Sequence, residues 1–255
     1  MTNPMQFPDG FVFGGATAAY QVEGETRTHG KGKVPWDDFL AAQGRFSPDP
    51  ASDFYNKYPV DIDLCQRFGI NGIRVSIAWS RIFPNGTGEI NPEGVQFYHD
   101  LFAECHKHHV EPFVTLHHFD TPLTLFEKGD FLNRETIDAF VDFATFCFQE
   151  YADQVTYWFT FNEPIVEPEQ RYQEGVWFPQ LHDFSRARTV QYHISLAHAL
   201  AVANYRRAYD EGAVRADAKI GMINCFTPVY TKENPSEADL EAVRMTSGIN
   251  NRWWL

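Results

Sequence analysis

The sequence predicts an α/β fold, a (β/α)8 barrel of the TIM-barrel type that is truncated after about five βα units. Short apolar runs rich in β-branched and aromatic residues alternate with longer segments whose apolar residues recur every three or four positions. This alternation is typical of parallel strands joined by helices. No G-x-G-x-x-G motif follows the first strand, as the dinucleotide site of an open doubly wound sheet requires, so the barrel is favoured.

The first two units are indicated by extended runs followed by helical stripes. Residues 11–17 form the first expected strand, and a polar loop from Glu23 to about Ser52 separates it from a helix that ends near Gly69. The apolar stripe of that helix is Phe54, Tyr58, Ile62, Cys65 and Phe68. Alternating apolar residues over 73–79 predict the second strand. Asn91 and Pro92 open the next helix, because proline is favoured at the first helical position.

Three further units follow the same pattern. Strands are expected at residues 112–119, 155–162 and 220–229. The two helices between them carry these apolar stripes: Ile137, Phe140, Val141, Ala144, Cys147, Phe148 and Tyr151, then Val190, Ile194, Ala197, Ala201 and Tyr205. A last helix is expected from about Ser236 to the end of the chain. Since the sequence stops among apolar residues without a capping glycine, we expect residues 1–255 to be a single barrel domain that is incomplete at its C-terminus.

Composition narrows the possible partners. The formal net charge of -13 repels nucleic acid and anionic membrane surfaces, so neither is expected as a partner. The four cysteines form no C-x-x-C pair, which argues against a zinc knuckle and against a dense disulfide framework. Without a basic, apolar N-terminal leader or a long apolar span, the sequence favours a soluble, cytoplasmic protein.

The fourth expected strand ends in a polar pair, Asn162 and Glu163, directly after the apolar run 157–161. In a (β/α)8 barrel the working residues lie where strands end and loops begin. A carboxyl group placed where water is largely excluded has a raised pKa and is suited to donate a proton near neutral pH. The alternative is that Glu163 only caps the turn that follows, and taken alone the two interpretations have about equal weight.

The third expected strand ends in His117, His118 and Asp120, which invites a metal-site hypothesis. Adjacent strand residues point to opposite faces, so the two imidazoles cannot easily share one ion. A hydrogen-bonding role for one histidine is favoured, and we expect no metal and no cofactor. The metal-dependent alternative would lose activity to chelators.

Two other strand ends carry polar side chains. Arg74 lies inside an apolar run of the second strand, and a guanidinium group in a barrel interior needs an anionic partner. That partner could be purely structural, or Arg74 could hold a catalytic carboxylate ionised. After the first strand, Gln21 offers an amide suited to gripping two neighbouring sugar hydroxyls, although this signal is weak by itself.

Four segments in order resemble the successive motifs of glycoside hydrolase family 1. They are residues 13–24 (FGGATAAYQVEG), 73–82 (IRVSIAWSRI), 115–122 (TLHHFDTP) and 160–164 (TFNEP). The resemblance covers essentially the whole chain. It is closest to the 6-phospho-β-galactosidase branch, notably at residues 51–55, 101–107 and 129–134, and Phe119 replaces the tryptophan that many members carry.

The resemblance implies roles for five residues. Glu163 would be the general acid/base, Asn162 would bind the sugar 2-hydroxyl, and Gln21 and His118 would bind other ring hydroxyls. Arg74 would orient the nucleophile. The implied reaction is retaining hydrolysis of O-glycosidic bonds, most simply of 6-phospho-β-galactosides or 6-phospho-β-glucosides, so a phosphorylated disaccharide or another β-glycoside is the expected small-molecule partner.

Trp36, in the run Val34-Pro35-Trp36-Asp37, also fits a motif of the family, but a packing role is equally compatible with the sequence.

The nucleophile of the family lies in a Thr-Glu-Asn-Gly motif, which does not occur here. We therefore expect the full-length protein to be the enzyme and this chain alone to be inactive. The alternative is that the chain ends at Leu255 as an inactive half-barrel that binds sugar weakly or associates. Self-association through the exposed edge of its sheet is then expected.

Overall fold

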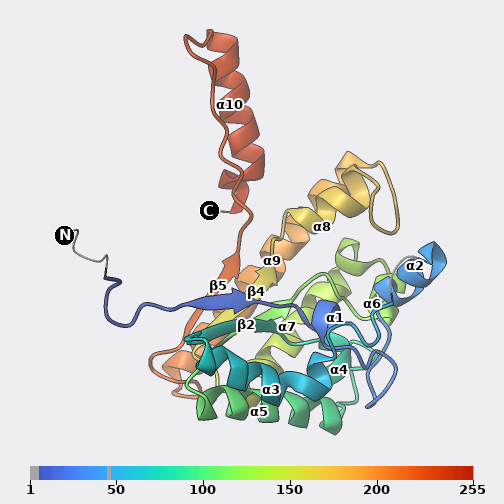
Figure 1. The fold of residues 1–255 in the computed structure, drawn as a ribbon. Helices are drawn as coiled ribbons and strands as arrows, with labels where there is room; N and C mark the ends of the chain where they lie inside the picture. Colours follow the sequence, from blue (N-terminus) through green and yellow to red (C-terminus); the bar gives the residue numbers. More distant parts are fainter. Residues whose placement is uncertain (1–5, 45–46, 255) are drawn as a thin grey trace.

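The structure, a computed structural model, describes residues 6–44 and 47–254 and is centred on one parallel sheet. The sheet has five strands in the order β1-β2-β3-β4-β5 (Figure 1). Their bounds are Gly14–Ala16, Gly72–Ser76, Glu111–His117, Tyr157–Asn162 and Lys219–Ile223. Every strand pairs with its neighbour in sequence, so successive βα units add side by side as in a (β/α)8 barrel.

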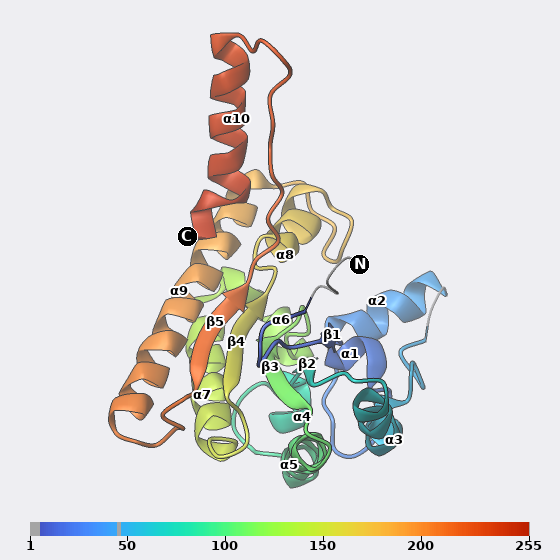
Figure 2. The same ribbon diagram turned by 60° about the vertical axis from the view of Figure 1, so that its left-hand side comes forward.

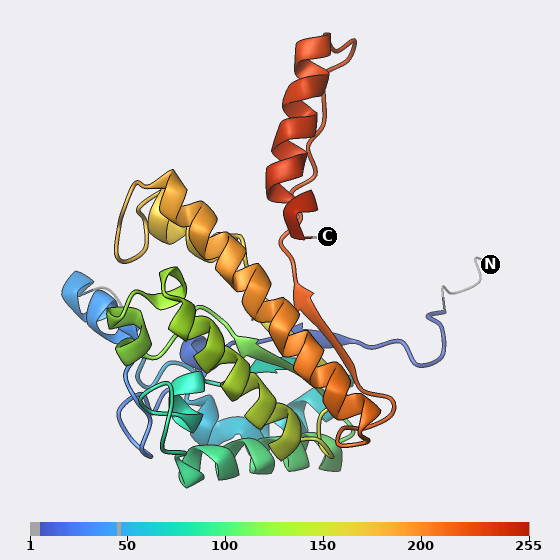
Figure 3. The same cartoon turned by 180° about the vertical axis from the view of Figure 1, so that it is seen from behind.

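Four long helices cover one face of this sheet (Figure 2). They are α3 (Phe54–Arg67), α5 (Pro92–Lys107), α7 (Arg134–Glu150) and α9 (Phe184–Asp210). The predicted start of α5 is confirmed, with Asn91 as its N-cap and Pro92 at the first helical position. The predicted start of the last helix at about Ser236 is also confirmed, but this helix, α10 (Glu237–Asn250), ends before the end of the chain and is followed by η3 (Arg252–Trp254). In Figures 1 and 3, α10 projects away from the sheet and its covering helices.

Short helical segments occupy the connections that follow the strands. They are α1 (Ala19–Val22), α2 (Pro35–Gln43), α4 (Trp79–Ile82), α6 (Leu123–Glu127), η1 (Asp130–Leu132), α8 (Val166–Pro168) and the π-helical η2 (Glu169–Gln173). These segments surround the carboxyl ends of the strands, where the candidate site residues lie. Among the described residues, no helix is both long and apolar enough to cross a membrane.

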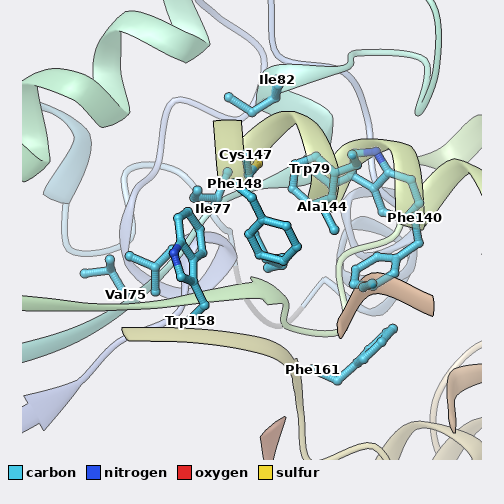
Figure 4. Close-up of a cluster of buried hydrophobic side chains, with 14 of the residues drawn as sticks. Val75, Ile77, Trp79, Ile82, Phe140, Ala144, Cys147, Phe148, Trp158 and Phe161 are labelled. Carbon is cyan, nitrogen blue, oxygen red and sulfur yellow. The ribbon is translucent and has the colours of Figure 1, made fainter. Parts of the chain in front are cut away.

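The hydrophobic core lies between the sheet and the long helices (Figure 4). Val75 and Trp158 project from β2 and β4 into this layer, where Trp158 meets Phe148 of α7 edge-on at 5.2 Å between ring centroids. Trp79 is fully buried and stacks on Phe143 at 5.2 Å. Because this layer packs the covered face of the sheet, the polar strand-end residues are left to the opposite face, which we call the inner face.

All five predicted strands are longer than those observed, and the differences at the first, second and fifth strands have local causes. Residues 11–13 do not join β1, because the Asn71 side chain accepts the Phe13 N–H at 2.7 Å and donates to the Phe11 carbonyl at 3.1 Å. Residues 77–79 leave β2, since Trp79 already begins α4. The fifth strand stops at Ile223, because β4 ends at Asn162 and leaves residues 224–229 without a strand to pair with.

The expected polar loop between residues 23 and 52 also differs, because it contains α2. Pro35 occupies the first turn of this helix, and the Asp37 carboxylate accepts the Val34 N–H at 2.9 Å. Both are helix-start signals that the sequence carried.

Candidate active site

Glu163 lies at the carboxyl end of β4, and β5 fixes its backbone. Its N–H donates to the Ile223 carbonyl at 2.7 Å, and its own carbonyl accepts from Val166 at 2.9 Å. The residue has a left-handed backbone with φ of 43°, an uncommon conformation for a residue other than glycine. The sequence predicted exclusion of water around this carboxylate, whereas its side chain is only partly buried in this structure.

Asn162 and Arg74 meet on the inner face. The Arg74 Nη1 donates to Asn162 Oδ1 at 2.8 Å, which joins β2 to the end of β4 across β3. The regular register between β4 and β5 is interrupted between Phe159 and Asn162. Such an irregularity can re-aim a side chain at a strand end, and here the Asn162 amide faces the Arg74 guanidinium.

Arg74 is half-buried, and two opposing effects act on the pKa of its guanidinium. Partial burial lowers the pKa of its guanidinium, while the negative charge of Glu163 acts in the opposite direction. Within residues 6–44 and 47–254, no carboxylate lies close enough to Arg74 for an ion pair, so its direct partner is the neutral Asn162 amide. The anionic partner that the sequence led us to expect is thus only a longer-range neighbour.

Gln21 and His118 line a cavity of about 450 Å³ beside these residues. Its other lining residues are Tyr20, Trp36, Leu40, Ser47, Pro48, Ala51, Phe119 and Trp177. The Gln21 side chain comes from α1 and is exposed, and His118 follows β3. The structure therefore places two predicted sugar-binding side chains in one cavity, while Arg74, Asn162 and Glu163 lie outside its lining.

His118 is a neutral hydrogen-bonding group in this site. Burial, with the positive charge of Arg74 and nearby His117, lowers the pKa of His118 to about 3. Its Nδ1 atom is buried and has no hydrogen-bond partner among the described residues. A neutral imidazole offers one donor and one acceptor, so His118 can bind a hydroxyl group in the cavity.

His117 points to the other side, as the strand geometry predicted. Its ring packs edge-on against Phe131, and its Nε2 lies 3.0 Å from Thr121 Oγ1. Burial lowers the pKa of His117 to about 3. In the part of the chain that the structure describes, no group of three or more histidine, cysteine, aspartate or glutamate side chains could hold a metal ion. Asp120 instead accepts the His118 backbone N–H at 3.1 Å, and burial raises the pKa of its carboxyl group to about 6.

Aromatic rings form one wall of the cavity. Trp36 packs edge-on against Trp177 at 5.1 Å and Phe178 at 4.6 Å, and its Nε1 donates to the Phe119 carbonyl at 2.7 Å. Trp36 therefore both packs and lines the cavity. Sequence reasoning missed Trp177, although a tryptophan in a loop bounded by Gly175 and a following proline is a recognisable signal for a ring held at a surface.

A second missed feature is a buried ionic cluster behind the cavity. The Arg171 guanidinium lies 2.7 Å from Glu167 Oε1 and 3.3 Å from Asp130 Oδ2, and all three side chains are buried. Burial raises the pKa of both carboxyl groups. The i, i+4 spacing of Glu167 and Arg171 was visible in the sequence, but Asp130 comes from a distant connection.

The five consecutive parallel βα units, with polar side chains gathered at the strand ends, define a protein of the (β/α)8-barrel class. The sequence profile described as glycosyl hydrolase family 1 matches residues 3–255. The chain belongs to glycosyl hydrolase family 1.

Individual relatives agree with this assignment. The chain is 49% identical over 249 residues to a Staphylococcus aureus protein named 6-phospho-beta-galactosidase, with 97% of the chain and 52% of that protein covered. The chain therefore spans about half the length of the curated relatives it matches.

Solved structures give the same picture. A rice β-glucosidase has a TM-score of 0.89 at 32% identity, covering 97% of this chain and 55% of that one. A β-glucosidase from Thermotoga maritima, solved with castanospermine, has a TM-score of 0.86 at 34% identity, covering 96% and 55%. The fold predicted from sequence is thereby confirmed.

Proposed function

We propose that the protein is a retaining β-glycosidase of carbohydrate catabolism that acts on 6-phospho-β-galactosides or 6-phospho-β-glucosides. Glu163 is its general acid/base, Asn162, Gln21 and His118 bind sugar hydroxyls, and Arg74 orients the nucleophile. The observation that carries this proposal is the grouping of Glu163 and Asn162 at the end of β4 with Arg74 in the middle of β2, where the charge of Glu163 acts on Arg74 without a direct ion pair. The phosphosugar preference rests on the name of the 49% identical relatives.

The proposed chemistry divides between two carboxylates. One attacks the anomeric carbon, while Glu163 protonates the departing oxygen and then deprotonates the incoming water, at a separation of about 5 Å. Since the sequence has no Thr-Glu-Asn-Gly motif, we assign the nucleophile to a segment other than residues 1–255. Arg74 would then supply the fixed positive charge that keeps the attacking carboxylate ionised and aligned.

The test uses the reading frame extended beyond Leu255 and a nitrophenyl 6-phospho-β-galactoside. Glu163→Gln should lower kcat by about 10²–10⁴-fold, the usual contribution of general acid–base catalysis. Azide should restore part of the turnover and yield a glycosyl azide of retained configuration, because azide needs no general base. The exposed acid Glu174, changed to glutamine, is the matched control and should leave kcat unchanged. Wild-type activity in Glu163→Gln would refute the assignment.

We further propose that the 255 residues alone give no turnover above background. The reason is the missing second carboxylate, not a failure to fold, since the core between sheet and helices forms one continuous cluster. For the same reason we assign residues 1–255 to a single domain. Robust hydrolysis by the isolated chain, abolished by Glu163→Gln, would refute the need for a further segment.

Self-association of the isolated chain is a second candidate property. Both β1 and β5 have one neighbour in the sheet, and apolar side chains are exposed beside these edges, including Phe11, Phe13 and Phe226. Unpaired parallel edges and exposed apolar rings favour pairing with another chain. Light scattering over a concentration series tests this property, and a monomer at all concentrations would contradict it. We assign the protein to the cytoplasm, where the four free cysteines of the structure would remain reduced.

A further inference from the structure

Residues 117–121, which run from the last residue of β3 towards α6, are anchored on the side opposite the cavity. His117 Nε2 and Thr121 Oγ1 are 3.0 Å apart, and the Thr121 hydroxyl donates to Asp130 Oδ1 at 3.0 Å. Since the Thr121 proton goes to the carboxylate, His117 is the donor in the first contact. The two ends of the segment are thus joined to each other, and Thr121 links them to the buried acid Asp130, while the His118 Nδ1 between them has no hydrogen-bond partner among the described residues.

The middle of this segment is held by its backbone. Phe119 has a left-handed conformation with φ of 66°, which costs free energy for a residue other than glycine and persists only where its surroundings enforce it. Its carbonyl accepts two hydrogen bonds, from Trp36 Nε1 at 2.7 Å and from Arg171 Nη2 at 3.3 Å. One carbonyl therefore joins a cavity wall to the buried ionic cluster.

Arg171 is held by contacts on several sides, while its buried Nε has no hydrogen-bond partner among the described residues. It contacts Glu167 at 2.7 Å and Asp130 at 3.3 Å, and its guanidinium carbon lies 4.3 Å from the centroid of the Phe178 ring. That ring also packs against Trp36. Arg171 thus reaches Trp36 by two routes, through the Phe119 carbonyl and through the Phe178 ring.

Stability alone gives no reason for this arrangement. Two buried carboxylates share one guanidinium, and a buried ion pair is often no more stabilising than apolar side chains of similar volume. Such a cluster does fix the positions of the groups around it, because the planar guanidinium donates its hydrogen bonds in fixed directions and fits few arrangements of acceptors. The geometry that Arg171 specifies here is the position of the Phe119 carbonyl.

We propose that Arg171 is a positioning residue for the sugar cavity. By holding the Phe119 carbonyl from behind, it fixes the Trp36 indole and presents the His118 imidazole to the ligand. The identity of the ligand in this inference rests on the proposed function, whereas the contacts of Arg171 are independent of it.

The first test needs no ligand. Arg171→Lys keeps the positive charge next to Glu167, but a single ammonium group cannot also reach the Phe119 carbonyl and stack on Phe178. The exchange of the Trp36 indole N–H with solvent, followed by NMR and assigned with Trp36→Phe, should accelerate by about fivefold, the equivalent of one net hydrogen bond.

The matched control is Arg81→Lys. Arg81 is equally buried, pairs with Glu23 at 2.9 Å and lies over the Tyr55 ring at 4.6 Å, yet it makes no hydrogen bond to Phe119. It should leave the Trp36 exchange unchanged. Unchanged exchange in Arg171→Lys, or equal acceleration in both variants, would overturn the proposal. If Arg171→Lys does not fold, the triple change Arg171→Met with Glu167→Met and Asp130→Asn removes all three charges of the cluster at similar volume, and the same acceleration is expected.

A second test measures ligand binding in the same proteins. Galactose 6-phosphate is titrated into the wild-type chain while the Trp36 indole and His118 ring signals are followed. Its Kd should rise at least about fivefold in Arg171→Lys and stay constant in Arg81→Lys. No response in the wild-type chain would count against the proposed substrate class, and the exchange measurement would still decide the role of Arg171. Equal Kd values in wild type and Arg171→Lys would overturn the positioning role.

Discussion

Acid should destabilise this protein in part through one buried imidazole, that of His117. The side chain is 1% exposed, and burial lowers its pKa to about 3, whereas an unfolded chain restores a value of about 6.5. Below pH 6.5 the unfolded state therefore binds a proton that the folded state refuses. This destabilisation by His117 is absent above pH 6.5, and it lowers the free energy of unfolding progressively as the pH falls from 6.5 towards 3.

The size of this effect follows from the two pKa values. Each pH unit in that window costs about 1.4 kcal/mol for one proton, so His117 should cost about 2 kcal/mol at pH 5 relative to pH 8. Asp120, with a pKa raised to about 6, acts in the opposite direction, because its folded form binds a proton first. A comparison with a variant at His117 cancels that opposing contribution.

The perturbation is His117→Gln, whose amide can still donate to Thr121 but does not titrate. Urea unfolding at pH 8 and pH 5 gives the free energy of unfolding of each protein. The loss between the two pH values should be smaller by about 2 kcal/mol in His117→Gln than in the wild-type chain. The exposed His182, changed to glutamine, should leave the loss unchanged. Equal pH dependence in wild type and His117→Gln would refute the reasoning, because it would mean that folded His117 accepts a proton as readily as the unfolded residue.

Three further changes have expected magnitudes. Arg81→Met leaves the buried Glu23 carboxylate without its ion pair and should lower the free energy of unfolding by about 3–5 kcal/mol in urea titrations. Gly32→Ala places a Cβ 1.8 Å from the Pro84 carbonyl oxygen, so the backbone must shift, at a cost of about 1–3 kcal/mol by the same titration. Ser236→Ala removes the N-cap of α10 and should accelerate hydrogen exchange of the amides in that helix by about fivefold, with no change in α7.

The fold could be predicted because the apolar residues of each long element recur at the spacing of its secondary structure. The stripes of α3, α5, α7 and α9 recur at helical spacing and pack on one sheet, so local pattern and tertiary packing agree. Strand ends were less accurate, since they depend on where a neighbour stops. Ile223 ends β5 because β4 ends, and the Asn71 side chain binds the Phe13 N–H and the Phe11 carbonyl in place of a neighbouring strand. Neither contact leaves a signal within the strand itself.

The candidate site also contains residues that could be predicted from the sequence and residues that could not. Arg74, Asn162 and Glu163 could be expected together, because the parallel strands of one sheet end at the same edge, and the long Arg74 side chain reaches Asn162 across β3. The positions of Arg171 and Trp177 beside the site could not be predicted, since both lie in the long connection between β4 and α9. The path of that connection is set by contacts with Phe119 and Trp36, both distant in sequence.

The two halves of the candidate site differ in what holds them. Glu163 takes its position from pairing between β4 and β5, through the N–H bond to Ile223, so its backbone is placed by residues within this chain. Within residues 6–44 and 47–254, the Arg74 guanidinium has one hydrogen-bond partner, the Asn162 amide, which restrains one of its nitrogen atoms and leaves the other donors for an anion. A retaining mechanism needs both carboxylates at a fixed separation. The precision of the proposed site must therefore come from Glu163 on one side and from whatever carboxylate occupies the free donors of Arg74 on the other.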